Sequence, residues 1–577
     1  MFQNIISTPI EDILQELSFC NSDISIDTET TGLNLIKDRA FGTSITFNNE
    51  SYFLRNEIYG IGNIKELLQR ICDSKNSLIF HNAKYDCHMI KNTYGISIPF
   101  GRVHDTYTIS FLLDNESSHG LKELACKYIS PDADKYEKFL KGYLDEHRIK
   151  NYALAPVHLM DIYARKDAEY TKKLKDILYP KLPAENKKWY EIERKILGII
   201  YNMEEHGILI DIPYFESLAK KMEDNLFKIE KEVREEVGYP IDIRSRDIEK
   251  ILYDKFKLPV IKRTDPSKTY PEGQISTDDD VLKKLNHPFA NKILQYRKLY
   301  KLRFTYIENF WNVDKNSRLH PTWNPLGART GRFTSEGPNF QNIPGLEIIR
   351  RGIICDKSLT EGDYSQLEFR IAAEDSQEPS IISEYKNNPN ADYHKTIASR
   401  MLGVSSEEVT IEQRRLGKTL NFGVLFGEGP DLLGEQLGCS KEEATEHIDN
   451  YFSSFPEIKN TIERFKKEKE NNGYIHTLFG RRINVKNVPP HAVFNYRIQG
   501  GSVDLLKIAL VKLDKYFGPN LGLMNTIHDS AYPENFDIKK DGKDFKRIME
   551  DFNLSVPIRV NIKHSERDWG SMKEVQV

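Results

Sequence analysis

Residues 414 to 427 combine cations and aromatic rings at a regular spacing. They are Arg-Arg-Leu-Gly-Lys-Thr-Leu-Asn-Phe-Gly-Val-Leu-Phe-Gly. On a helix, residues four positions apart drift by only about 40°, so one slanted stripe carries Arg414, Lys418, Phe422 and Phe426. Cations followed by rings suit a molecule with a polyphosphate at one end and a base at the other, such as a nucleoside triphosphate. An amphipathic helix with a solvated basic edge explains these residues equally well.

Four carboxylates in the first third of the chain could hold metal ions. Asp27 and Glu29 alternate along a predicted strand and therefore lie on one face. Asp86 follows a short apolar run, and Asp167 lies one helical turn after Tyr163 on the same helix face. Converging carboxylates repel each other unless a divalent cation neutralises them. Each one alone is more often a cap or a turn residue, and a structural acidic cluster is the alternative for the set.

Two further acidic residues lie far apart in the last half of the chain. Asp363 falls where a predicted strand gives way to a helix, and Asp529 lies with His528 at the tip of a predicted hairpin. Ser365 and Glu368 have the spacing of a capping box at the start of that helix. A helix cap is therefore a structural explanation for Glu368.

Local sequence signals predict where the helices and strands that would position these residues begin and end. Thr410 and Gln413 have capping-box spacing and Gly427 is a stop signal, so we predict one helix from about 411 to 426. The other predicted elements are two strands joined by a turn over 22–47, a strand at 77–80, a helix at 158–177, a hinge at 181–192 that leads into a new helix, mainly helical chain from about 214 to 310, and an irregular segment at 328–344.

Length and composition limit the classes of protein to which the chain can belong. With 577 residues the chain is too long for one core, and two to four domains are expected. Its 39% hydrophobic and 29% charged residues are ordinary for a soluble globular protein. No stretch approaches the roughly 18 to 20 apolar residues that span a bilayer, and the N-terminus lacks a signal-peptide pattern. We expect a cytoplasmic protein without a membrane partner, and free thiols at its six scattered cysteines.

The charge balance limits how the chain could contact nucleic acid. A net charge of −4 excludes a chain coated in basic residues, so such contact would need local patches. One candidate patch is the stretch 291–303, which has no acidic residue and contains Lys292, Arg297, Lys298, Lys301 and Arg303. A solvated helix face is the commoner explanation of such a run.

The spacing of Arg, Lys, aromatic-Gly and aromatic-Gly in residues 414 to 427 resembles the nucleotide-binding helix of the family A DNA polymerases. The resemblance implies that Arg414 and Lys418 hold the triphosphate, with His394 assisting, and that Phe422 packs on the base and sugar. Phe426 stands where the family more often has Tyr, which keeps the ring and removes a hydroxyl.

The same resemblance extends to other motifs in the family's order. Asp363 and Asp529 match the residues that bind both catalytic metals, helped by the backbone carbonyl of Tyr364. Glu368 matches the residue that blocks a ribose 2′-hydroxyl, and Ser530 replaces the Glu of the family's His-Asp-Glu motif. The resemblance further implies Gln366 at the nucleotide, and Arg332, Asn495, Gln499 and His528 at the DNA, where an Arg in the minor groove tests pair shape without reading sequence.

The ordered motifs Asp-x-Glu, Asn-x-x-Tyr-Asp and Tyr-x-x-x-Asp in the first third of the chain resemble the 3′-5′ exonucleases with a DEDD-type site. This resemblance implies that Asp27, Glu29, Asp86 and Asp167 bind two divalent metals and that Tyr163 orients the attacking water. In such chemistry the ions lie about 3.5 to 4 Å apart, and one makes hydroxide while the other stabilises the leaving oxygen.

The expected fold is an α/β exonuclease domain with a mixed, ribonuclease H-like sheet, followed by an α+β right-hand polymerase domain. The expected boundaries are 1–182 for the exonuclease domain and 183–577 for the polymerase domain, with the thumb at about 193–315, the palm at about 316–395 and 475–577, and the fingers at about 396–474.

The expected function is template-directed DNA synthesis from deoxynucleoside triphosphates with 3′-5′ proofreading, in the replication of a phage or an organelle, without a 5′ nuclease domain. We expect two Mg²⁺ ions at the polymerase site and two divalent ions at the exonuclease site, with Mn²⁺ as an alternative. Primer-template DNA is the expected partner, and a helicase, a primase and a processivity factor are further candidates. The rival hypotheses are an exonuclease whose C-terminal half only grips DNA, and a non-enzymatic scaffold for primer-template junctions.

Overall fold

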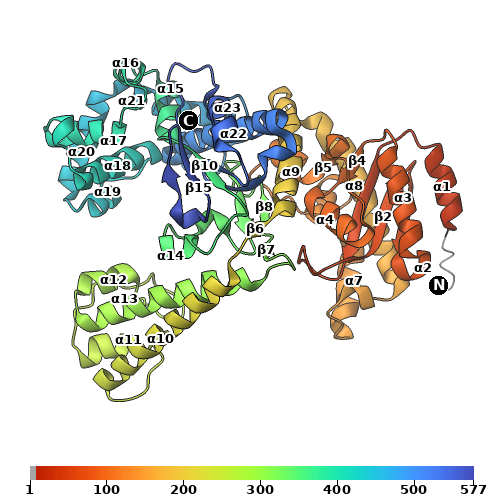
Figure 1. Ribbon diagram of the computed structural model, residues 1–577, viewed down its shortest axis with the longest axis horizontal. Helices are drawn as coiled ribbons and strands as arrows, with labels where there is room; N and C mark the ends of the chain where they lie inside the picture. Colours follow the sequence, from red (N-terminus) through yellow and green to blue (C-terminus); the bar gives the residue numbers. More distant parts are fainter. Residues whose placement is uncertain (1–7) are drawn as a thin grey trace.

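The computed structural model describes residues 8–577, which form two sheet-containing bodies and two helical lobes (Figure 1). An N-terminal body contains the first sheet, and a central body contains the second. An upper lobe and a lower lobe, both mainly helical, project from the central body on the side away from the N-terminal body. This arrangement agrees with the expected exonuclease domain followed by a right hand.

The sheet of the N-terminal body has five strands in the order β3-β2-β1-β4-β5. Strands β1, β2 and β3 are antiparallel, whereas β4 and β5 run parallel to β1. Their bounds are β1 (Ile24–Thr30), β2 (Ala40–Phe47), β3 (Glu50–Arg55), β4 (Leu78–Phe80) and β5 (Val103–Asp105). The sheet is mixed, as expected, and the predicted strands at 22–47 and 77–80 are confirmed.

Helices cover the sheet, and alternation along β1 divides its side chains between two layers. Ile24 and Ile26 join a core with helices from one layer, while the Ser25 hydroxyl donates to the Ala168 carbonyl of the long helix in the other, at 2.7 Å. Odd-numbered residues of β1 therefore face that long helix. The helices are α1 (Ile10–Ser18), α2 (Asn56–Tyr59), α3 (Ile61–Asp73), α4 (Ala83–Tyr94), α5 (Thr106–Leu113), α6 (Leu121–Tyr128), α7 (Lys135–Glu146) and the long α8 (Val157–Leu178).

Helix α9 (Ala184–His206) lies between the N-terminal and central bodies and belongs to both (Figure 1). Near its start, the Asn186 amide donates to the Leu112 carbonyl of the N-terminal body at 2.5 Å and accepts the Arg482 backbone N–H of the central body at 2.9 Å. The prediction of a hinge over 181–192 is therefore wrong, because most of that segment is a helix bonded on both sides.

A second five-stranded sheet, in the order β13-β14-β10-β15-β16, forms the centre of the molecule. Its strands are β10 (Leu359–Tyr364), β13 (Leu523–Ile527), β14 (Ser530–Pro533), β15 (Val560–Ser565) and β16 (Lys573–Glu574). Helices α14 (Glu347–Arg350), α15 (Leu367–Ser376), α22 (Val493–Phe517) and α23 (Ile538–Glu550) accompany it, with strand pairs β6 (Ile208–Leu209) and β7 (Arg318–Leu319), β8 (Thr322–Asn324) and β9 (Thr334–Glu336), and β11 (Tyr474–His476) and β12 (Arg482–Asn484).

Each lobe has its own hydrophobic core. The lower lobe consists of α10 (Ile212–Val237), α11 (Asp247–Lys250), α12 (Asp279–Leu285) and α13 (Pro288–Lys301). The upper lobe consists of α16 (Pro379–Asn387), α17 (Tyr393–Leu402), α18 (Ile411–Phe426), α19 (Pro430–Leu437), α20 (Lys441–Ser454) and α21 (Pro456–Asn472). The predicted helix at 411–426 is confirmed at both ends, since Thr410 and Gln413 form a capping box and Gly427 has a φ of 76°.

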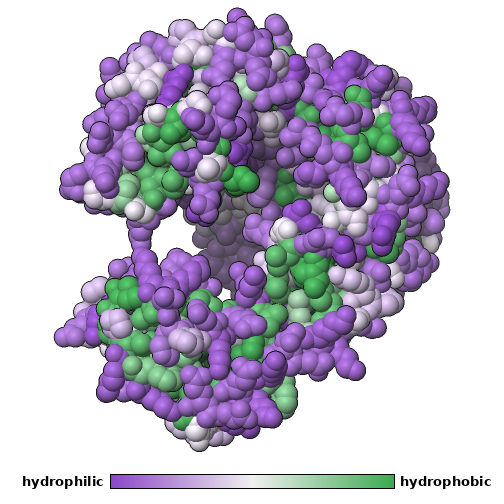
Figure 2. All heavy atoms as spheres, turned by 60° about the vertical axis from the view of Figure 1, so that its left-hand side comes forward, coloured by the Kyte–Doolittle hydropathy of each residue, from purple (hydrophilic) through white to green (hydrophobic). Residues whose placement is uncertain are grey.

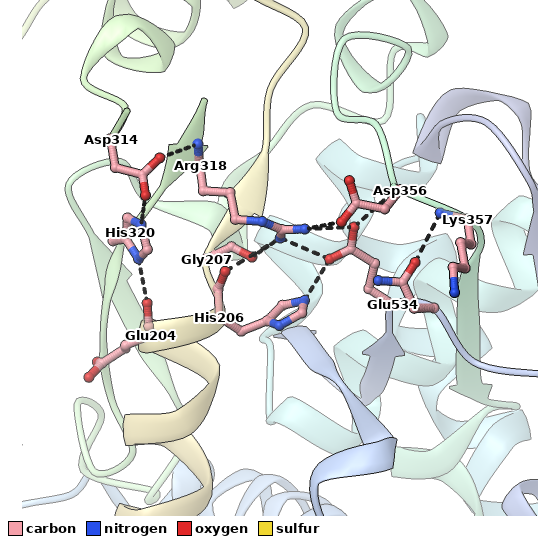
Figure 3. A network of polar contacts seen from close by, with 10 residues as sticks. Glu204, His206, Gly207, Asp314, Arg318, His320, Asp356, Lys357 and Glu534 are labelled. Atoms are coloured by element: carbon pink, nitrogen blue, oxygen red, sulfur yellow. Dashed lines mark hydrogen bonds and ion pairs between the residues drawn. The ribbon is translucent and has the colours of Figure 1, made fainter. Parts of the chain in front are cut away.

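A polar network attaches the base of the lower lobe to the central sheet (Figure 3). Arg318 of β7 contacts Glu534, just beyond β14, at 2.9 Å and Asp356 at 2.7 Å. His206, at the end of α9, contacts the same Glu534 carboxylate at 2.5 Å. Because the Glu534 side chain is fully buried, removing the Arg318 side chain would leave a costly unpaired charge.

Figure 2 shows a wide cleft between the two lobes, with mainly hydrophilic residues along its rims. The lobes also meet through an ion pair, in which Lys284 of α12 lies 2.9 Å from Glu435 of α19. Both side chains are exposed, so this pair contributes little stability and leaves the lobes free to move apart.

Two expectations from composition can be compared with the structure. The six cysteines are free thiols, as expected. Within residues 8–577, none of the helices combines the length and apolar character needed to cross a membrane.

A buried ion pair between α9 and α22 leads to a testable prediction. The Lys507 amine donates to Glu193 at 2.7 Å and to the Pro325 carbonyl at 2.8 Å, and both charged side chains are inaccessible to solvent. Removing one partner of such a pair typically costs about 3 to 5 kcal/mol. We expect Glu193→Gln to lower the free energy of unfolding by that amount in urea titrations. Adding Lys507→Met should restore at least half of the loss, and a double variant no more stable than the single one would contradict this account.

Candidate active sites

Three carboxylates of the N-terminal body converge between β1 and α8. Ligand atoms of Asp27, Glu29 and Asp167 lie within 4.8 Å of one another. Strand alternation turns Asp27 and Glu29 toward α8, and α8 presents Asp167 to them one turn after Tyr163. Of the four carboxylates predicted to converge, the structure brings these three together, and we call them the acidic triad.

Asp86 lies beside the triad and outside it. It belongs to the first turn of α4. Its Oδ1 accepts two hydrogen bonds from Thr28, from the backbone N–H at 3.0 Å and from the hydroxyl at 2.6 Å. Thr28 separates Asp27 from Glu29 along β1, so these bonds hold the fourth carboxylate next to the triad.

The surroundings of these carboxylates disfavour their negative charge. Burial raises the pKa of Asp27 to about 6. Burial, reinforced by the charge of Asp27, also raises the pKa values of Glu29 and Asp86. Oxygen ligands gathered at this spacing suit a hard divalent cation, which would restore their ionised forms. The donor set therefore fits the metal ions that the sequence implied.

A lysine that the sequence analysis did not select lies against the triad. Lys122, in the first turn of α6, makes an ion pair with Asp167. Its amine lies 4.5 Å from the centre of the Tyr163 ring. No sequence signal could have identified this residue, because its partners lie on another helix and α6 contains a second lysine, Lys127, that the sequence does not distinguish from it.

In the central body, Asp363 and Asp529 lie close together near the C-terminal end of β10. Asp363 lies near the end of β10 and pairs across the sheet with Ser530, so the preceding Asp529 lies at the tip of the β13–β14 hairpin. His528 supplies the positive φ of 50° that the tip requires. The predicted hairpin is therefore confirmed. The Ser530 hydroxyl donates to Asp363 at 2.5 Å.

The electrostatics of this second pair resemble those of the triad. Burial, followed by repulsion from Glu368, raises the pKa of Asp529 to about 7, and Asp363 adds to the effect. Burial also raises the pKa of Asp363, which the Ser530 hydrogen bond opposes. Two carboxylates with this preference for a proton or a cation are suited to a metal site.

The predicted helix cap at Glu368 is wrong. The cap position of α15 is Gln366, which has a φ of 51° and makes no side-chain cap. The Glu368 carboxylate instead makes an ion pair with Arg332. Arg332 and Glu368 thus lie together next to Asp529, where both affect its pKa.

Gln366 connects this acidic pair to the upper lobe. Its side-chain oxygen accepts the Tyr393 backbone N–H at 3.0 Å, and its amide donates to the Ala391 carbonyl at 3.1 Å. Both bonds lie at the start of α17, which packs along α18. The sequence predicted that Gln366 contacts the nucleotide. In the structure its side-chain amide is hydrogen-bonded to the backbone of Ala391 and Tyr393.

The predicted stripe on α18 is present. Arg414 pairs with Asp392 at 2.5 Å. One turn later the exposed amine of Lys418 lies 5.6 Å from the centre of the Phe422 ring. The rings of Phe422 and Phe426 follow with a centroid separation of 5.3 Å. The stripe therefore runs from cations to rings along one helix face.

His394 of α17 lies behind the stripe. Its ring is 5.6 Å from the Phe422 ring. Burial, together with the nearby positive charge of Arg414, lowers the pKa of His394 to about 4. A neutral imidazole therefore stands beside the two cations at neutral pH.

The remaining predicted residues are placed as follows. Asn495 and Gln499 lie half-buried near the start of α22, and the Asn495 amide oxygen is buried without a hydrogen-bond partner. His528 is exposed at the hairpin tip. The Tyr364 hydroxyl donates to the Met549 carbonyl at 2.8 Å, which fixes the end of β10.

Comparison with known proteins adds independent information. The model of DNA polymerase family A matches residues 212–571, and a 3′-5′ exonuclease model matches residues 6–183. DNA polymerase I of Borreliella burgdorferi is 30% identical over 98% of this chain and 64% of its own length. The thermostable DNA polymerase I of Thermus aquaticus is 35% identical over 67% of this chain and 48% of its own length.

These relatives are bacterial, so the comparisons give no support to the expected phage or organellar source. The chain spans between about half and two thirds of their length. A solved structure, the POL domain of Pol1 from M. smegmatis in complex with DNA primer-template and dNTP, has the same fold, with a TM-score of 0.81 and 23% identity over 98% of this chain and 99% of that one.

The family model of the polymerase covers well over half of the chain, and the exonuclease model covers the body that precedes it. The chain therefore belongs to DNA polymerase family A and carries a 3′-5′ exonuclease domain on the N-terminal side of its polymerase domain.

Proposed function

We propose that this chain extends DNA primers from deoxynucleoside triphosphates and removes 3′-terminal nucleotides at a separate site. One observation carries the proposal: each sheet-containing body holds its own group of converging carboxylates, the triad in one and Asp363 with Asp529 in the other. Family membership supports both activities. It weakens the two rival hypotheses, namely an exonuclease whose C-terminal half only grips DNA and a non-enzymatic scaffold for primer-template junctions.

We also propose the division of the chain that the sequence suggested. The exonuclease domain is 1–182 and the polymerase domain 183–577, with the lower lobe as thumb, the central body as palm and the upper lobe as fingers. The expected thumb boundary at about 193 falls inside α9, and the lower lobe itself begins with α10. The cleft between the lobes (Figure 2) is the proposed place of primer-template DNA.

At the polymerase site, Arg414 and Lys418 would bind the triphosphate, while Phe422 would lie against the sugar and base. Gln366 supports this geometry, because it ties the cap of α15, two residues before Glu368, to the start of α17. Movement of the α17–α18 pair is thereby linked to the strand that bears Asp363. Neutral His394 would donate a hydrogen bond to the phosphates and add no charge.

Asp363 and Asp529, with the carbonyl of Tyr364, would hold two Mg²⁺ ions, and the exonuclease residues two divalent ions. The ions would supply Lewis acidity and charge neutralisation at the reacting phosphate. Arg332, Asn495, Gln499 and His528 would position the primer-template, with Arg332 reaching the minor groove. Helicase, primase and processivity partners stay predictions from the sequence.

The first prediction from the proposed function is that the two acidic sites act independently of each other. Asp27→Ala with Glu29→Ala should abolish shortening of a labelled primer and leave extension nearly intact, because the sites lie in different bodies. Asp529→Ala should stop extension and preserve shortening. Both are measured on one primer-template with Mg²⁺, with and without nucleotides, beside exposed-carboxylate controls Asp132→Ala and Asp551→Ala. Undiminished degradation by the double variant would refute the exonuclease assignment, and extension by Asp529→Ala would refute the polymerase assignment.

The second prediction concerns sugar selection. Glu368→Ala should admit ribonucleotides, since a methyl group leaves space for a 2′-hydroxyl that the carboxylate stem excludes. We expect the ratio of kcat/KM for dATP to that for ATP to fall about tenfold or more. Glu407→Ala, which removes an exposed carboxylate of the upper lobe, is the control. An unchanged ratio in Glu368→Ala would show that this side chain does not face the sugar.

The third prediction tests the register of α18. Phe422→Tyr should reduce discrimination against dideoxynucleotides, because the new hydroxyl can replace the missing 3′-hydroxyl beside the triphosphate. One hydrogen bond to a charged group is worth roughly 1.5 to 3 kcal/mol, or about ten- to a hundredfold. The measurement is incorporation of ddTTP against dTTP in the Asp27→Ala, Glu29→Ala background. Phe426→Tyr, one turn further, should have no such effect. Equal ratios in wild type and Phe422→Tyr would show that Phe422 does not face the sugar of the nucleotide.

A further inference from the structure

A lysine side chain lies against the acidic triad. Within residues 8–577, Lys122 is the one cation that forms an ion pair with any member of the triad. Only 13% of its side chain is exposed. Its amine lies 4.5 Å from the centre of the Tyr163 ring and 5.8 Å from that of Tyr170. Lys122 is thus held between the metal-binding oxygens and the tyrosine expected to orient water.

A divalent ion and this ammonium would compete for the Asp167 carboxylate. An ion bound by the triad must contact Asp167, which Lys122 now contacts. Two cations at such close range repel strongly in a partly buried site. When the ion binds, we expect the ammonium to move away from Asp167 and to stay beside the rings of Tyr163 and Tyr170, next to which it already lies. The nearby Glu137 carboxylate is already paired with Lys141, so the further anion available to the ammonium is the phosphodiester that the substrate brings.

We propose that Lys122 is a catalytic residue of the exonuclease site, whose ammonium contacts a non-bridging oxygen of the scissile phosphate. This inference rests on the exonuclease activity proposed above. In the reaction, a bond forms between the water oxygen and phosphorus, and the bond from phosphorus to the 3′ oxygen of the penultimate nucleotide breaks. One water proton ends on that 3′ oxygen. Lys122 keeps its protons throughout and stabilises the negative charge that develops on the phosphate.

Two other roles for Lys122 make different predictions. If it only neutralises the triad before metal binds, removing its charge should tighten metal binding and leave cleavage at saturating metal unchanged. If it only supports the local structure, its loss should weaken metal binding and slow cleavage together. Of the three roles, only a catalytic one predicts that removing the charge of Lys122 slows cleavage without weakening metal binding.

The experiment compares Lys122→Met, which keeps the stem and removes the charge, with Lys122→Arg and with Lys127→Met, which removes an exposed lysine of the same helix. All are made in the full-length Asp363→Ala, Asp529→Ala background, so that Mn²⁺ binding, followed by electron paramagnetic resonance, reports the exonuclease site. Single-turnover cleavage of labelled single-stranded DNA is measured at saturating Mn²⁺.

We expect Lys122→Met to cleave about 100-fold more slowly and to bind Mn²⁺ as tightly as its parent or several-fold more tightly. Lys122→Arg should lose less than Lys122→Met, and Lys127→Met should match the parent. An unchanged rate in Lys122→Met, or a rate loss accompanied by weaker Mn²⁺ binding, would overturn the proposal while leaving the exonuclease assignment intact. A parent that fails to shorten DNA would overturn both.

Discussion

The constraint on which this structure depends is the mutual repulsion of carboxylates held at close range. In the N-terminal body, Asp27 and Glu29 are forced together by strand alternation, and burial makes their ionised forms still less favourable. In the central body, a cross-strand pairing brings Asp529 beside Asp363. Each body builds its acidic group around the central strand of its sheet, β1 or β10. A residue from elsewhere completes the group, Asp167 from α8 in one body and Asp529 from a hairpin tip in the other.

Two arginines near the central acidic pair are engaged by protein carboxylates. Arg414 is paired with Asp392, and Arg332 with Glu368. Each pair keeps a basic side chain oriented in the absence of an anionic ligand, and under the proposed function each would loosen when a phosphate or a sugar arrives. Specificity and order of binding would then follow from exchange of partners rather than from empty, solvated charges. The ion pair between the lobes is exposed, whereas the network at the base of the lower lobe (Figure 3) is built on the buried carboxylate of Glu534.

Features determined by neighbouring residues were predictable from the sequence. The helix at 411–426 is confirmed at both ends because its capping box and terminal glycine act locally. Features determined by distant residues were not. Glu368 had the spacing of a cap, but its partner is Arg332. Lys122 was missed because its contacts lie on α8, and the supposed hinge at 181–192 is helical because two bodies bind it at once. The two acidic groups were identified through motif order, since spacing alone left a structural cluster open.

The central claim is that one chain holds two separate divalent-metal sites, one in each sheet-containing body. The most direct test is to locate Mn²⁺ by anomalous scattering in crystals of the full chain with primer-template DNA and a non-hydrolysable nucleotide. We predict anomalous density beside Asp363 and Asp529 and, independently, beside Asp27, Glu29 and Asp167. Ions bound only elsewhere, or at one of the two groups alone at saturating Mn²⁺, would contradict the claim.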